Sequence, residues 1–220
     1  QLDGKVALVT GAARGQGRSH AIRLAEDNVA AGGGPFGAVL VDQPLMRNVL
    51  TDLALESEAA TLLGLRLAHA LDEGDTELSR LGVAIGKYWV CKRTSPFVAE
   101  ALECLGGNGY VEERGEGVMA RIYREMPVNS IWEGSGNVQC LDVLRALSKE
   151  PGVLDALFSA LGDGHGDARL KAHIQRLKAD FSDTADIQYR ARQLTEDMAV
   201  ALQAKLLLEA GNSLVSDAFI

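Results

Sequence analysis

A carboxylate-bearing loop directly precedes a predicted helix in the middle of the chain. Trp132, Glu133, Gly134 and Ser135 follow one another, and the apolar periodicity predicts a helix from residue 136 to about 148. Glycines allow tight turning, and the N–H groups at a helix start favour anionic or electron-rich ligand groups. An aromatic ring, a possible base and a helix N-terminus would therefore lie within a few residues of one another, which is typical of a catalytic site.

Two interpretations of Glu133 differ in the burial of its side chain. A carboxylate that acts as a general base works best when apolar and aromatic groups surround it, and Trp132 is its neighbour here. A solvated loop acid would instead stabilise the following helix through the helix dipole, by about 0.3–1 kcal/mol. Ser135 likewise fits a ligand contact or a plain helix N-cap.

The composition is that of a globular protein. Of the 220 residues 47% are hydrophobic and 24% charged, which is enough to bury a sizeable core. A net charge of -8 disfavours nucleic acid or an anionic membrane as a partner, and no apolar run is long enough to span a bilayer. The basic stretch at residues 169–178 is interleaved with aspartates, which predicts a solvated helix face rather than a DNA-binding surface.

Cysteine and histidine usage bears on redox chemistry and metal binding. The cysteines lie in apolar helical patterns without C-x-x-C spacing, which indicates reduced packing residues in a cytoplasmic protein. The histidines show no metal-ligand grouping, so we expect no metal site. These residues are Cys91, Cys104 and Cys140, and His20, His69, His165 and His173.

Residues 2–27 form a segment of a different kind. A short apolar run at residues 6–9 is typical of a buried strand, and a glycine-rich turn at residues 11–17 leads into a helix. The segment resembles the first strand, turn and helix of the short-chain dehydrogenases/reductases, which bind a nicotinamide dinucleotide at such a turn. That family also needs a Tyr-x-x-x-Lys pair, and the only such spacing here joins Tyr88 to Lys92. The remaining sequence supplies no complete parallel sheet.

The rest of the chain predicts helices. Four of them make a bundle-like arrangement, with Ser95 and Pro96 as the N-cap and first-turn proline of the third. Three more helices follow the bundle. The expected spans are residues 44–73, 76–92, 95–105 and 136–148, then 153–161, 167–180 and 184–210.

Two stretches carry a longer resemblance, ECLGGNGYVEE at residues 103–113 and IWEGSGNVQCLDVLRAL at residues 131–147. They resemble the C-terminal helical domain of the acyl-CoA dehydrogenases, in the branch of the alkylation-response and isovaleryl-CoA dehydrogenases, and the likeness runs from about Phe36 to residue 220. The resemblance implies a mainly α fold: a four-helix-bundle-like domain with a helical extension. A single βα (Rossmann-like) fragment would precede it.

The resemblance also implies FAD-dependent α,β-dehydrogenation of an acyl-CoA thioester, in fatty acid metabolism. Glu133 is then the base that removes the α-proton, with Trp132 and Gly134 at the substrate. The expected flavin contacts are Phe36, Gly106, Gly107, Ser135 and Asn137, and the glycines among them would meet the flavin nucleotide of a neighbouring subunit.

Three positions depart from the family pattern. Gly33 stands three residues before Phe36, where the family has an arginine that would hold a phosphate, so flavin binding should be weaker. Glu103 and Asn137 each stand where a glutamine is common. Gly106 would fit a helix C-cap equally well.

The sequence divides into three expected parts: residues 1–34 as the βα fragment and linker, 35–162 as the helical bundle, and 163–220 as the extension. The chain begins without Met and lacks the family's N-terminal helical and middle β domains, so we expect a trimmed or incomplete chain. The favoured function is that of an acyl-CoA dehydrogenase in a homodimer or homotetramer. An NAD(P)-dependent short-chain oxidoreductase and a non-catalytic helical oligomerisation module are the alternatives.

Overall fold

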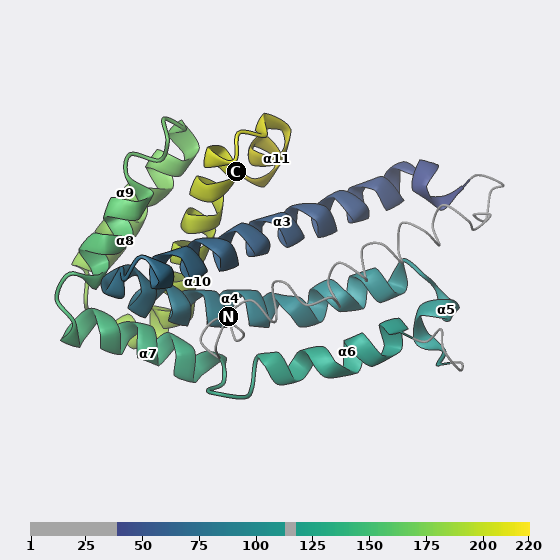
Figure 1. Cartoon of the computed structure of the whole chain (residues 1–220), viewed down its shortest axis with the longest axis horizontal. Coiled ribbons are helices and arrows are strands. Elements are labelled where there is room, and N and C mark those ends of the chain that lie inside the picture. Colours follow the sequence, from purple (N-terminus) through teal and green to yellow (C-terminus); the bar gives the residue numbers. More distant parts are fainter. Residues whose placement is uncertain (1–38, 113–117) are drawn as a thin grey trace.

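The computed structural model describes residues 39–112 and 118–220, and this part of the chain is almost entirely helical (Figure 1). The mainly α fold that the sequence predicts is therefore confirmed. The βα fragment expected at residues 1–34 lies outside the described residues. The elements, labelled as in Figure 1, are the 3₁₀ helix η1 (Leu40–Asp42) and the α-helices α3 (Pro44–Asp72), α4 (Thr76–Glu103), α5 (Gly107–Tyr110), α6 (Val118–Asn129), α7 (Gly136–Lys149), α8 (Val153–Leu161), α9 (Ala168–Ser182), α10 (Ile187–Glu209) and α11 (Ser213–Phe219).

Helices α3 and α4 form a long antiparallel hairpin (Figure 1). Pro44 occupies the first turn of α3, where its missing N–H costs nothing, and the Asp75 carboxylate caps α4 by accepting from the Leu78 N–H at 3.0 Å. The two helices approach closely at Gly82, where an added Cβ would lie 2.4 Å from Leu67 Cδ2. A side chain at this position would displace the end of the Leu67 side chain, so glycine lets the two helices pack this closely.

The predicted helix break at Ser95 and Pro96 is wrong, because α4 continues through both residues to Glu103. A proline inside a helix loses one hydrogen bond and costs about 3 kcal/mol. Val90 before the proline and Phe97 after it are both buried, and burying each large apolar side chain contributes about 1.5–3 kcal/mol. Packing on both sides therefore outweighs the local cost and keeps one continuous helix.

The second and third helices expected for the bundle are therefore the single helix α4, and the bundle consists of α3 and α4 with α6 and α7 end to end along α4 (Figure 1). Helix α6 was not among the expected spans, although Met119, Ile122 and Met126 recur on it at three- and four-residue steps. Met119 and Ile122 are buried in an apolar cluster with Leu53 of α3 and Phe97 of α4. The other expected helices are confirmed with small shifts at their ends, and α5 and α11 are additions.

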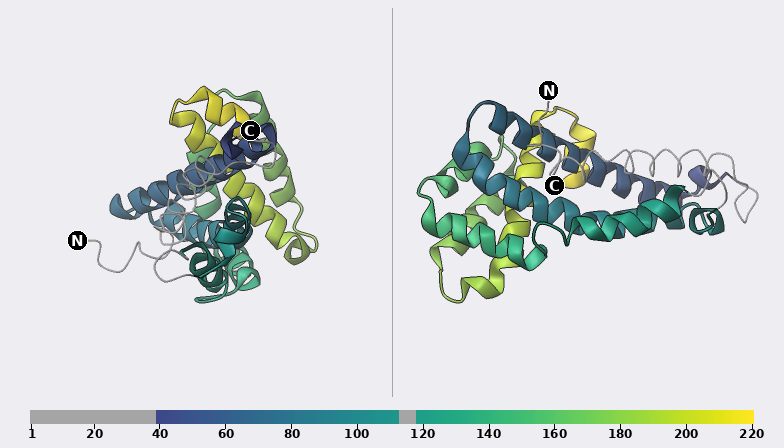
Figure 2. Two further views of the ribbon diagram at one scale, coloured as in Figure 1. Left: turned by 90° about the vertical axis from the view of Figure 1, so that its right-hand side faces the viewer. Right: turned by 60° about the horizontal axis from the view of Figure 1, so that its bottom comes forward.

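The largest apolar core joins the bundle to the three helices that follow it. Leu63 of α3, Ile85 of α4 and Val143 of α7 pack in one cluster with Leu157 of α8 and Met198 of α10. Figure 2 shows α8 to α10 gathered at one end of the long α3–α4 hairpin. The core therefore crosses the boundary expected after residue 162, and the division into domains stays a prediction.

Basic residues on α9 are largely engaged with neighbouring groups. Arg169 pairs with Asp167 at 2.8 Å and with Asp217 at 3.0 Å, and Arg176 Nη2 lies 2.6 Å from His173 Nδ1. The hydrogen bond from Arg169 is the main cause that lowers the pKa of Asp167 to about 2. Arg169 is therefore held in ion pairs within the chain, and Arg176 is held by a neighbouring side chain on the same helix.

Two further properties concern the described part of the chain. None of its helices combines the length and the apolar composition needed to cross a bilayer. Within residues 39–112 and 118–220, no three His, Cys, Asp or Glu side chains gather in a way that would hold a metal ion.

Met198→Ala tests whether α10 belongs to the same core as the bundle. Met198 is fully buried, so the variant should lose about 2–5 kcal/mol of the free energy of unfolding. Urea denaturation followed by circular dichroism would measure this, with Leu214→Ala, at an 83% exposed position, as the control. A loss below 1 kcal/mol, or a separate unfolding step for α8 to α10, would contradict the shared core.

Candidate active site at the start of helix α7

Glu133 lies on the short loop that joins α6 to α7, in a backbone conformation that is unusual for its residue type. Its φ angle is 57°, in the left-handed region, and Gly134 follows with a φ of 106°. A left-handed residue other than glycine costs on the order of 1–3 kcal/mol and persists where its surroundings determine it. Ser135 then returns to an extended conformation as the N-cap of α7. The sequence-predicted Trp-Glu-Gly-Ser loop and its helix are thus present, at a strained position.

The loop is tied down from the α7 side by a side chain that the sequence analysis did not single out. Gln139 Nε2 donates to the Glu133 carbonyl oxygen at 2.8 Å and lies 3.4 Å from the Gly134 carbonyl oxygen. A Cβ on Gly134 would lie 2.8 Å from Gln139 Nε2 and 3.1 Å from Val138 Cγ1. The φ angle of Gly134 therefore favours glycine, and a Cβ there would also displace the Gln139 side chain.

Helix α4 supplies the floor of the site through two consecutive residues. Lys87 is buried and its Nζ donates to the Asn129 carbonyl oxygen at 2.7 Å. The same Nζ lies 5.0 Å from the centroid of the Trp132 ring. The Tyr88 ring packs under Gly136, where an added Cβ would meet it at 3.3 Å. The loop therefore rests on α4 as well as on α7.

The Tyr88 hydroxyl lies in a buried cluster with Cys140 and Ala191. Burial raises the pKa of Tyr88, and the Cys140 thiol raises it further. Lys92, its predicted partner in a Tyr-x-x-x-Lys pair, is exposed on α4. Tyr88 thus packs beneath α7, whereas Lys92 lies at the surface.

The first turn of α7 presents polar groups next to Glu133. Ser135 is exposed and its hydroxyl makes no capping hydrogen bond. The Asn137 side chain accepts a hydrogen bond from Arg192 Nε of α10 at 2.8 Å. Arg80 of α4 holds α7 from further along, through two hydrogen bonds to Asp142 at 2.9 and 3.0 Å. The helix start that was predicted to favour an electron-rich ligand is thus open and fixed in place.

Glu133 itself is exposed, and so are several apolar side chains around it. Exposure alone favours the loop-acid interpretation for this chain by itself. Exposed apolar side chains gather here on α6, the loop and α7, and such a patch indicates a surface that binds a ligand or another part of a protein. They are Val128, Ile131, Trp132, Val138 and Leu141, with 44–62% of their surface exposed.

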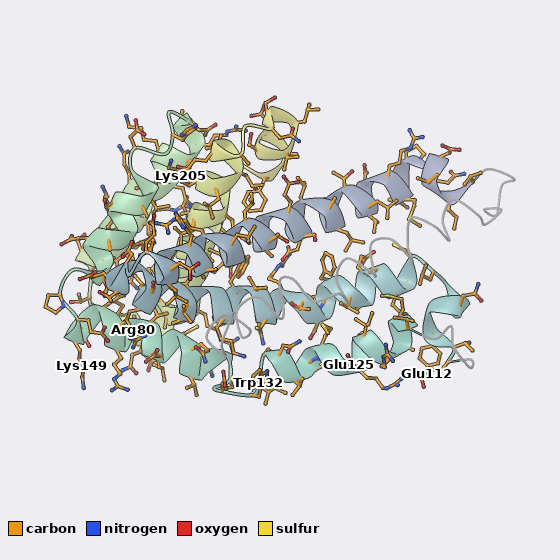
Figure 3. The ribbon with its side chains drawn as sticks, in the orientation of Figure 1. Arg80, Glu112, Glu125, Trp132, Lys149 and Lys205 are labelled. Carbon is orange, nitrogen blue, oxygen red and sulfur yellow. The ribbon has the colours of Figure 1, made fainter. Side chains whose placement is uncertain are left out.

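The structure does not bring the two groups of predicted flavin residues together within one chain. Gly106 and Gly107 lie at the start of α5, and both are exposed with open space where a Cβ would stand. Helix α6 separates them from the Glu133 loop, and its 12 residues span about 18 Å. Figure 3 shows Trp132 at one end of α6 and Glu112, which follows α5, toward the other. Phe36, the remaining predicted contact, lies outside the described residues.

Comparisons with known proteins identify the family. A model of the acyl-CoA dehydrogenase C-terminal domain matches residues 20–148, which is more than half of the chain. The chain belongs to the acyl-CoA dehydrogenase family. The match begins upstream of Phe36, where the sequence analysis placed the start of the likeness, and overlaps the end of the segment at residues 2–27.

Two curated relatives within the acyl-CoA dehydrogenase family agree with this assignment. AidB of Escherichia coli (strain K12) is 51% identical over 156 residues, which cover 69% of this chain and 28% of AidB. Acyl-CoA dehydrogenase family member 11 of Caenorhabditis elegans is 30% identical over 188 residues, which cover 82% of this chain and 28% of that protein. The chain therefore spans little more than a quarter of the length of these relatives.

Solved structures of the acyl-CoA dehydrogenase family share the fold. The structure of C. elegans ACDH-11 in complex with C11-CoA has a TM-score of 0.82 at 24% identity, covering 96% of this chain and 40% of that one. An acyl-CoA dehydrogenase from Bacillus anthracis, complexed with FAD, has a TM-score of 0.70 at 17% identity, covering 97% of this chain and 45% of that one. The arrangement of α3 to α10 is thus that of the C-terminal helical part of the family.

Gly134→Ala tests the left-handed loop. The substitution should cost about 1–3 kcal/mol of folding free energy, because alanine disfavours a φ of 106° and its Cβ would displace Gln139. Chemical denaturation would measure the loss. Gly107→Ala is the matched control, since its Cβ would meet open space. Equal stability of the two variants would show that the loop does not need its left-handed glycine.

Proposed function

We propose that this chain is the C-terminal helical part of an FAD-dependent acyl-CoA dehydrogenase, in which Glu133 removes the α-proton of an acyl-CoA thioester. The observation that supports this most directly is the position of Glu133. Its side chain stands exposed on a left-handed loop, pinned from two sides, immediately before the start of α7. A base held this way can meet a substrate without rearranging the backbone.

The residues around Glu133 fit one face of a flavin. The Ser135 hydroxyl, the Asn137 amide and the N-terminal N–H groups of α7 can donate to the polar edge of the ring system, and the half-exposed Trp132 offers an aromatic surface. When bound, the flavin supplies the hydride acceptor of the reaction. The residues of this chain would orient the ring and the thioester, and Glu133 would accept the proton.

Gly106 and Gly107 suit a second flavin contact because their backbone is exposed at the surface. Their distance from Glu133 along α6 supports the prediction that they serve the flavin of a neighbouring subunit. On this proposal the functional unit is a homo-oligomer, a dimer or a tetramer. Each site would then combine residues of two chains.

On this proposal the bound substrate and further parts of the protein would bury the Glu133 side chain. The exposed apolar side chains around the loop, among them Ile131 and Trp132, offer a surface for the acyl thioester and for further protein. The chain spans 28% of the length of its curated relatives, so the remainder of such a protein could cover this surface. The C11-CoA bound to ACDH-11 supports acyl-CoA as the substrate class.

The alternatives have different support. A nicotinamide-dependent oxidoreductase rests on residues 2–27, outside the described residues, and on Tyr88 and Lys92, of which one is buried and the other exposed. A non-catalytic oligomerisation module is favoured by the exposed apolar side chains near α7. A stable oligomer that retains no flavin would favour the oligomerisation module over the dehydrogenase. A cytoplasmic location remains a prediction.

Flavin retention is the first test of the proposed function. The purified chain should retain FAD after incubation and desalting, with absorption between about 350 and 500 nm, because the family fold and the polar start of α7 favour the ring system. Ser135→Ala should lower the retained fraction, and Ser148→Ala, at the exposed far end of α7, serves as the control. A parent chain without retained flavin would contradict cofactor binding by this chain.

Glu133→Gln tests the base. In a chain that holds flavin, C11-CoA should bleach the absorption in the parent, and the variant should slow this reduction by about 10²–10⁴-fold because no carboxylate takes the α-proton. Stopped-flow absorption would give the rate constants. Glu125→Gln, at an exposed position on α6, should react like the parent. An unchanged rate in Glu133→Gln would remove Glu133 from the mechanism.

A further inference from the structure

At the end of α6, one main-chain carbonyl accepts a hydrogen bond from a side chain of another helix. The last carbonyl groups of a helix have no partner inside it. Here the Pro127 oxygen accepts from the Ser130 N–H at 3.3 Å, and the Val128 oxygen accepts from the N–H groups of Ile131 and Trp132 at 3.0 Å each. The Asn129 oxygen comes next, and it accepts from Lys87 Nζ at 2.7 Å.

Lys87 makes this contact from inside the protein. Only 6% of its surface is exposed, although lysine is among the residues least often buried. Two features compensate: a carbonyl at the negative end of the α6 dipole, and the face of the Trp132 ring 5.0 Å away. Both contacts direct the Lys87 side chain toward the segment that leads into the Glu133 loop.

The two partners of Lys87 lie on the chain segment that leads into Glu133. Asn129 is the last residue of α6, and Trp132 directly precedes Glu133. Gln139 holds the carbonyl groups on the other side of the loop. The left-handed φ of Glu133 is therefore fixed between a buried cation below and a side-chain amide of α7.

We propose that Lys87 is a positioning residue: it holds the backbone of residues 130–135 so that Glu133 projects in one direction. The proposal rests on the proposed function, since it assigns Lys87 to the loop that carries the base. Lys87 touches neither substrate nor flavin in this scheme, and it acts through Asn129 and Trp132. A loop free to move would present Glu133 in many orientations, and small misplacements cost rate steeply.

The loop can be observed without any turnover. The chain has two tryptophans, so 5-fluorotryptophan labelling gives two fluorine resonances, assigned by Trp132→Phe. Trp89 is an internal reference, because its indole N–H is held by a hydrogen bond to Gln203 of α10 at 2.8 Å. In Lys87→Met the Trp132 resonance should shift by more than its linewidth and become narrower, while the Trp89 resonance stays in place.

Two variants serve as controls. Lys87→Arg keeps a cation and donors, so it should restore most of the parent spectrum. Lys92→Met lies on the same helix at an exposed position and should leave the Trp132 resonance unchanged. If Lys87→Met fails to fold by circular dichroism, Lys87→Gln, whose amide is one atom shorter, replaces it. An unchanged Trp132 resonance in folded Lys87→Met, or in Lys87→Gln where it replaces that variant, would overturn the proposal.

Kinetics separate positioning from general stability. In a parent chain that reduces flavin with C11-CoA, Lys87→Met should lower the rate constant at saturating substrate about ten- to a hundredfold, and leave the half-saturating concentration and retained flavin near the parent values. An unchanged rate constant would overturn the positioning role. A parent without flavin reduction would instead count against the proposed function, and the fluorine spectra would then decide on Lys87.

Discussion

Burial of α4 on almost every side is the constraint on which the rest of the structure depends. This helix packs against α3, α6, α7, α8 and α10, and it contributes buried residues to each apolar cluster of the described chain. The packing energy of its buried side chains outweighs the cost of Pro96, so the helix continues through the proline. Helix α4 also holds the candidate site in place, because Lys87 and Tyr88 form the floor beneath the Glu133 loop.

The loop at Glu133 shows how the rigid scaffold and local strain combine. Two left-handed residues in succession would be unfavourable in a free peptide. Gln139 on one side and Lys87 on the other supply the hydrogen bonds that hold this conformation. Arg80, through its pair with Asp142, fixes the helix that follows. The exposed Glu133 carboxylate thus extends from a well-defined backbone, as its proposed role as a base would require.

Much of this arrangement was predictable from the sequence, because it follows from short-range signals. Apolar periodicity gave α3, α7 and α8, and the Trp-Glu-Gly-Ser loop fell directly before a helix as expected. The break at Pro96 was wrong because local propensity cannot register how strongly both flanks are buried. Lys87 and Gln139 were missed because their partners are main-chain carbonyl groups. No residue pattern marks such contacts before the fold brings them together.

The continuity of α4 has a consequence for how this part of the protein can vary. The 28 residues of the helix span about 42 Å, with the floor of the Glu133 loop near the middle and the turn to Gly106 at the end. An inserted residue would lengthen the rod by about 1.5 Å and rotate everything beyond it by about 100°. Gly106 would then face another direction relative to Lys87. Length changes between these two positions should therefore be tolerated only as whole helical turns.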